Sequence, residues 1–206
     1  MNKFIKIKSL LIICCLLSSG LMQAQDNNQY LRFTVMAMAP DLETRMIFED
    51  ELVRVLREDD YDVVASHTLV PEISPAVSLE VRQALIEAGI QAALVLRPLA
   101  TGNDASITAA QEALSQQTYT SLAAFINDYR GHNFESQAVV HVLGFLLDPQ
   151  QSRLFWQGVI WLDDTVETQE QAIEKLVELV QFNLNQSRTV LRHQLGLPPL
   201  IIMQEE

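Results

Sequence analysis

The chain has 206 residues, of which 49% are hydrophobic and 19% charged, and its formal net charge is −12. This balance is typical of a globular protein and excludes a disordered chain. The surplus of acid makes nucleic acid and anionic lipid poor direct partners, because both would be repelled.

Residues 1–24 have the pattern of a secretion signal. Lysines at positions 3, 6 and 8 precede an apolar run over 10–17, and small residues lead to a predicted cleavage site after Ala24. The apolar run is too short for a stable membrane span, so we expect no transmembrane span after the signal is removed. Removal takes away three lysines and no acidic residue, which lowers the net charge from −12 to −15. The predicted location is the periplasm.

Both cysteines, Cys14 and Cys15, lie inside this predicted signal. The secreted chain is therefore expected to have no disulfide and no thiolate chemistry. Ser18, Ser19 and Gly20 resemble the small half of a lipoprotein cleavage site, but Leu21 stands where the anchoring cysteine would be. We expect a soluble protein without a lipid anchor, and a lipoprotein is the alternative.

The remaining residues, 25–206, predict one α/β domain. Alternation over 30–38 indicates a strand, and Asp41 is expected to cap a helix that ends at the acidic run 58–60. A second strand over 61–66, a helix over 79–88 and a third strand over 90–97 follow. This β-α-β-α-β order predicts right-handed crossovers and parallel pairing for part of the sheet.

The second half of the chain predicts a hairpin and a long helix. Residues 100–135 form an excursion with one or two helical pieces, and long excursions are usually functional or mobile. Strands over 136–147 and 153–162 form the hairpin, a helix begins near position 164, and 197–206 is a tail. The predicted fold is an α/β (α+β) domain with a mixed five-stranded sheet in the order β-α-β-α-β-β-β-α and helices mainly on one face.

Symmetric pairing of the hairpin strands sorts their side chains into two faces. Gly144 would lie opposite Trp156 and leave room for the indole ring. The face of Gly144 and Trp156 is mostly apolar, so we expect it to face the core, with the other face covered by the 100–135 segment or by a partner. The expected members of that other face are His141, Leu143, Phe145, Phe155, Gln157, Val159 and Trp161.

Exposed apolar groups mark interaction surfaces. The candidates in this chain come from the second hairpin face and the apolar tail, and they are Phe145, Phe155, Trp161, Leu200, Ile201 and Ile202. The alternative interpretation is that these side chains pack within the protein itself.

No catalytic, metal or cofactor site is predicted from the polar residues. The four histidines have no metal-ligand spacing, and His141 is expected to be a packed, hydrogen-bonded core residue. Ser66 and His67 follow a strand end, but no Gly-x-Ser-x-Gly elbow surrounds Ser66. The acidic runs 49–51 and 58–60 lack the spacing of a calcium loop and are expected to be solvated.

Several short patterns resemble a family of envelope proteins and lipoproteins from Gram-negative bacteria. These are Phe48-Glu49-Asp50-x-Leu52, Tyr61-x-Val63-x-x-Ser66-x-x-Leu69-x-Pro71, Ala92-x-Leu94-Val95-x-Arg97-x-Leu99 and Leu154-Phe155-Trp156-Gln157-Gly158. The layout is also similar to the small α/β domains of the curli secretion lipoprotein CsgG, the penicillin-binding-protein activator LpoB and the N-terminal domain of TolB. The resemblance implies an envelope assembly or interaction module and implies no active site.

The leading hypothesis is a periplasmic, non-enzymatic accessory module. It would bind another envelope protein, or itself, through the second sheet face or the C-terminal tail. The alternative is a periplasmic small-molecule-binding protein whose ligand lies between the sheet and the 100–135 segment, in an apolar cavity lined by Phe145, Trp161 and Leu122. A hydrolase that uses Ser66 and His67 is a distant third.

Overall fold

The computed structural model describes residues 32–59, 61–100, 108–112, 119–134, 138–162 and 166–194, with side chains to residue 186. The helices and strands are, in chain order, β1 (Phe33–Ala37), α2 (Leu42–Glu58), β2 (Val63–Ala65), the 3-10 turns η1 (Ser66–Thr68) and η2 (Pro75–Val77), α3 (Ser78–Glu87), β3 (Ala92–Ala100), α5 (Leu122–Asn127), β4 (Val139–Leu147), β5 (Ser152–Trp161) and α6 (Gln169–Gln194).

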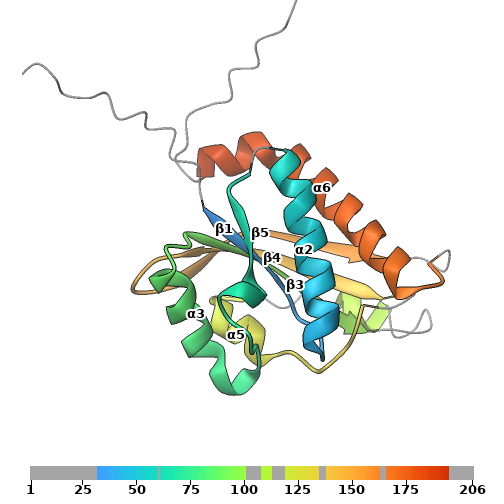
Figure 1. The fold of residues 1–206 in the computed structure, drawn as a ribbon, viewed down its shortest axis with the longest axis horizontal. Coiled ribbons are helices and arrows are strands. Elements are labelled where there is room, and N and C mark those ends of the chain that lie inside the picture. Colours follow the sequence, from blue (N-terminus) through green and yellow to red (C-terminus); the bar gives the residue numbers. More distant parts are fainter. Residues whose placement is uncertain are drawn as a thin grey trace, which may run out of the picture.

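One five-stranded sheet organises these elements, in the spatial order β2-β1-β3-β4-β5. Figure 1 shows helix α2 lying across this sheet. Strand β1 pairs in parallel with β2 and β3, while β4 pairs antiparallel with both β3 and β5. The predicted mixed sheet and its parallel first half are therefore confirmed. Asp41 caps α2 as expected, since its Oδ1 accepts a bond of 2.7 Å from the backbone N–H of Thr44.

The two long helices, α2 and α6, cover one face of the sheet, so most helical residues lie on that side, as predicted. They pack side by side, joined at one end by Gln169 to Thr44 and at the other by Gln181 to Asp59 (Figure 1). We name the side chains between them and the sheet the first-face core; its members include Val35, Leu94, Val140, Val142 and Ile160 from the strands, Phe48 and Leu52 from α2, and Ile173, Leu176 and Val180 from α6.

The short helices α3 and α5 cover the opposite face. Helix α5 belongs to the 100–135 segment, which was expected to cover this side. Their apolar side chains form what we name the second-face core; its members include Met36, Ala93, Val95, Leu143 and Phe145 from the strands, Val81 and Leu85 from α3, and Leu122, Phe125 and Ile126 from α5. The sheet is thus buried on both sides where β1 and β3 run, which accounts for the continuous apolar sequence of β3.

The register of the hairpin differs from the symmetric pairing at one position. Gly144 does lie opposite Trp156, but Phe145 lies opposite Leu154, so Phe155 is an extra residue in a β-bulge. As a result Phe155 turns to the first-face core and Leu154 to the second-face core, the reverse of the prediction. The space at Gly144 is used by the Phe155 ring and not by the indole, since a Cβ added there would lie 2.7 Å from Phe155 Cζ.

Helix α6 begins later than position 164, at Gln169. Its start is fixed by a reciprocal cap: Thr168 Oγ1 accepts a bond from the N–H of Gln171, and the Gln171 side chain accepts one from the N–H of Thr168. This Thr-x-x-Gln arrangement is a capping box, and it satisfies donors that the first helical turn leaves free.

Candidate functional site

A buried carboxylate, Glu49, holds together the carboxyl ends of β1 and β2. Its side chain is 0% exposed, and Oε1 accepts bonds from the N–H of Ala37 at 2.9 Å, from Arg45 Nε at 2.8 Å and from Ser66 Oγ at 2.8 Å. Oε2 accepts a bond of 2.7 Å from the N–H of His67, whose ring Nδ1 lies 3.1 Å away. The expectation that the acidic run 49–51 is solvated is wrong for Glu49, which faces inward because α2 packs on the sheet.

The arrangement of Ser66 and His67 does not support nucleophilic chemistry. Ser66 Oγ donates to Glu49 and accepts a bond of 2.7 Å from Arg45 Nη2, and the residue is fully buried. The His67 ring is directed to Glu49 and to Asp50, with Nε2 3.5 Å from Asp50 Oδ1. A serine nucleophile needs a base at its hydroxyl and access to substrate. Here the hydroxyl is held between a carboxylate and a guanidinium, which makes the group a structural clamp.

A second polar cluster lies beneath α5, on the second face of the sheet. Arg97 is 1% exposed. Its Nη1 donates to the carbonyl of Phe125 at 3.0 Å and to Asp128 Oδ2 at 3.2 Å. Its Nη2 donates to Tyr119 Oη at 2.5 Å. Tyr119 Oη in turn donates to Asp128 Oδ2. The guanidinium also stacks against two rings, 4.1 Å from the centre of Phe125 and 4.9 Å from that of Tyr119. These contacts tie α5 to β3.

His141 is the neighbour of Arg97 on β4 and shares its buried setting. Burial, and then the nearby Arg97 charge, lower the pKa of His141 to about 4, so the ring is neutral at physiological pH. Within the described part of the chain, its Nδ1 and Arg97 Nε are buried and have no hydrogen-bond partner. The predicted packed core histidine is confirmed, since the ring meets Phe125 edge-on at 5.3 Å, but the predicted hydrogen bond is wrong for Nδ1.

Burial also raises the pKa of Tyr119, which is 5% exposed. Its hydrogen bond to Asp128 adds to this effect, and the bond from Arg97 opposes it. The tyrosine therefore stays protonated and keeps donating to Asp128. Sequence reasoning missed this cluster because Arg97 closes an apolar run, and no pattern linked it to Tyr119 or Asp128.

The predicted interaction residues have different positions in the structure. Phe145 is 0% exposed in the second-face core, so its assignment to an exposed surface is wrong and it packs within the protein instead. Phe155 is half-buried on the first face because of the bulge, which corrects its assignment to the second face. Trp161 is 47% exposed. Leu200, Ile201 and Ile202 lie outside the described residues.

Trp161 lies at an end of the second face that none of the described helices covers. Helix α5 covers only the beginning of β5, where the N–H of Leu122 donates to Ser152 Oγ at 2.8 Å. Farther along the strand the side chains of Gln157, Val159 and Trp161 are exposed, the last two by 47% each. We name these three residues the β5 patch. The predicted apolar cavity is not formed by its three residues, since Phe145 and Leu122 pack in the second-face core while Trp161 lies at the surface.

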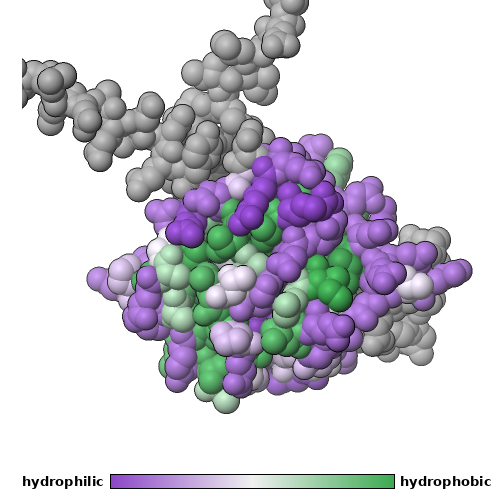
Figure 2. Space-filling view, in the orientation of Figure 1, coloured by the Kyte–Doolittle hydropathy of each residue, from purple (hydrophilic) through white to green (hydrophobic). Residues whose placement is uncertain are grey.

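Two other surface features lie on α2. Apolar side chains reach the surface over its first half, where Leu42, Met46 and Ile47 are 47%, 40% and 52% exposed, and Figure 2 shows apolar groups among polar ones in this region. The second half lines an open surface pocket of about 440 Å³.

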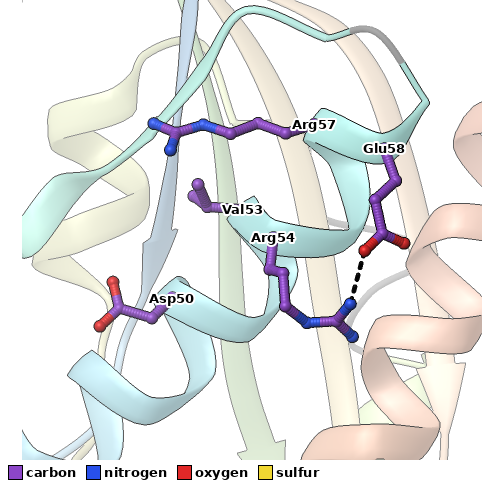
Figure 3. Close-up of a pocket in the computed structure, with 5 residues that line it drawn as sticks. All are labelled: Asp50, Val53, Arg54, Arg57 and Glu58. Carbon is purple, nitrogen blue, oxygen red and sulfur yellow. Dashed lines mark hydrogen bonds and ion pairs between the residues drawn. The ribbon is translucent and has the colours of Figure 1, made fainter.

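This pocket is lined by Asp50, Val53, Arg54, Arg57 and Glu58 (Figure 3). Arg54 bonds to Glu58 at 2.7 Å and to Glu51 at 2.6 Å. Its charge is therefore already paired on the helix itself, and such exposed pairs contribute little to stability. The pocket presents no unpaired Arg54 charge to a ligand.

Two negative findings hold for the part of the chain that the structure describes. No group of three or more His, Cys, Asp or Glu side chains is arranged to hold a metal ion there. None of the described helices combines the length and the apolar character needed to cross a membrane.

Comparison with models of protein families, with curated proteins and with solved structures found no match for this chain.

Proposed function

We propose that this protein is a periplasmic, non-enzymatic accessory module of the cell envelope. It binds another envelope protein, or a second copy of itself, through the β5 patch. The exposed apolar pair Val159 and Trp161 carries this proposal, because each is 47% exposed on a sheet face whose described core is buried beneath α3 and α5. Exposed apolar groups of this kind are typical of interaction sites.

Three further observations support the proposal. The N-terminal 24 residues have the pattern of a secretion signal. The polar clusters around Glu49 and Arg97 serve to fix the fold, since most of their atoms bond to one another or to backbone. The chain layout also resembles envelope interaction modules.

Photo-crosslinking in living cells tests the proposal. A photoreactive amino acid replaces Trp161 in the secreted chain, and in the control it replaces Leu79, which is 69% exposed on α3. After irradiation the tagged chain is purified and its adducts are identified by mass spectrometry. We expect a reproducible protein adduct from position 161 and none of that mass from position 79. The absence of any specific adduct at position 161 would contradict the proposal.

A further inference from the structure

The two edges of the sheet differ in how they are closed. The β2 edge is three residues long, and Arg57 Nε donates to the carbonyl of Val63 at 3.0 Å. The carbonyls of Asp62 and Val64 accept bonds from β1 residues, so the carbonyl of Val63 points to the open side. Arg57 therefore occupies the free edge of β2, a common way to prevent further strand pairing.

Among the described residues, nothing comparable closes the β5 edge. Strand β5 is ten residues long and no described strand lies beyond it. Its sequence from Ser152 to Trp161 contains no proline and no acidic residue, and its one charge is Arg153. A long apolar edge strand is a template for pairing with another strand.

The charge distribution favours a second copy of the chain as the occupant. The chain has 26 acidic and 14 basic residues, yet 149–162 contains no acid. Two copies of this acidic protein can therefore approach at β5 without like charges facing each other on the strand. In an antiparallel arrangement centred on Gly158, Arg153 of one copy lies opposite Leu162 of the other, so the one charge of the strand meets no like charge.

We infer that β5 pairs antiparallel with β5 of a second copy, around a two-fold axis at Gly158, and joins the two sheets into one. This inference rests on the proposed function and names its partner. With Phe155 as the extra residue of the bulge, this register places Leu154 opposite Trp161 of the second copy and Gln157 opposite Val159. On the second face Trp161 then forms an apolar cross-strand pair with Leu154, and Val159 packs against the side chain of Gln157. Such a contact is isologous and closes as a dimer.

Analytical ultracentrifugation of the secreted chain, from low to high micromolar concentration, tests the dimer. We expect a reversible dimer for the wild type. Val159→Lys places a charge at the centre of the contact, and we expect the dissociation constant to rise roughly tenfold or more. Gln157→Lys is a second variant at an exposed position, with the same expectation. Leu79→Lys, which changes an exposed apolar residue on α3, is expected to dimerise like the wild type.

Mixed disulfide formation tests the register. The only cysteines of the chain lie at positions 14 and 15, so the secreted chain is expected to offer no competing thiol. A tagged Gln157→Cys chain and an untagged Val159→Cys chain are mixed and mildly oxidised. We expect the mixed covalent dimer to exceed both homodimers, because positions 157 and 159 face each other in this register. An excess of either homodimer would overturn the register.

The outcomes separate this inference from the proposed function. A dimer that Val159→Lys and Gln157→Lys leave intact would overturn the pairing of β5. A monomer at every concentration would also overturn it, while a different envelope protein crosslinked at position 161 would leave the proposed function standing. Adducts of the chain with itself at position 161, lost in Val159→Lys, would support both.

Discussion

His141 gives the protein a defined sensitivity to acid. The pKa of the folded ring is about 4, whereas an unfolded histidine has a pKa of about 6.5. The stabilisation from a neutral His141 is therefore fully present above about pH 6.5. As the pH falls below that value the unfolded chain binds a proton that the folded chain does not, and stability is lost until about pH 4. A difference of one pKa unit corresponds to about 1.4 kcal/mol, so the loss from pH 7 to pH 5 is about 2 kcal/mol.

Urea unfolding at a series of pH values measures this loss. The variant His141→Phe keeps a ring against Phe125 but binds no proton, so its free energy of unfolding should fall by about 2 kcal/mol less than that of the wild type between pH 7 and pH 5. His132→Phe, which retains His141, is the matched control and should lose stability as the wild type does. Parallel curves for the wild type and His141→Phe would refute the assignment of a neutral, buried ring.

Three other substitutions test the packing by chemical denaturation. Glu49→Gln leaves the Arg45 charge buried without its partner and should lower the free energy of unfolding by about 3–5 kcal/mol. A loss below about 1 kcal/mol would show that Glu49 is solvated. Gly144→Ala forces the Phe155 ring to move and should lower the free energy of unfolding by about 1–3 kcal/mol. Adding Phe155→Leu should recover part of this loss, and no recovery would show that the strain arises elsewhere. Phe48→Ala removes a fully buried ring and should cost about 3–5 kcal/mol, and a near-neutral effect would contradict its core position.

The order of elements was predictable from the sequence because the spacing of the apolar residues and the positions of the turn residues agree with the fold. Alternation marked β1, the apolar run of β3 marked a strand buried on both faces, and the polar loop at 148–152 marked the hairpin. The bulge was not predictable, because an extra residue in one strand leaves the composition of both strands unchanged. The bulge places Phe155, one of the predicted interaction residues, on the first face of the sheet instead of the second.

The polar clusters around Glu49 and Arg97 could not be predicted from the sequence, for a different reason. Glu49 lies in the run Glu49-Asp50-Glu51, which has the appearance of a solvated helix face, and only the packing of α2 on the sheet sends one of the three inward. Arg97 and Asp128 are 31 residues apart, and their contact depends on where α5 returns to the sheet. The sheet face of Trp161 was predictable, because the residues of β5 beyond the bulge follow a regular alternation.

Strand β1 lies between two strands that follow it in the chain. Its partners β2 and β3 begin at Val63 and Ala92, so the parallel half of the sheet cannot be completed until the chain has been supplied to residue 100. The antiparallel hairpin needs only the turn at 148–151 to bring its strands together, and local contacts of that kind form faster than distant ones. Strand β1 ends at Ala37 and its first partner begins at Val63, so β1 stays without a partner while the chain between them is supplied. Its apolar residues are the ones that need protection during that interval.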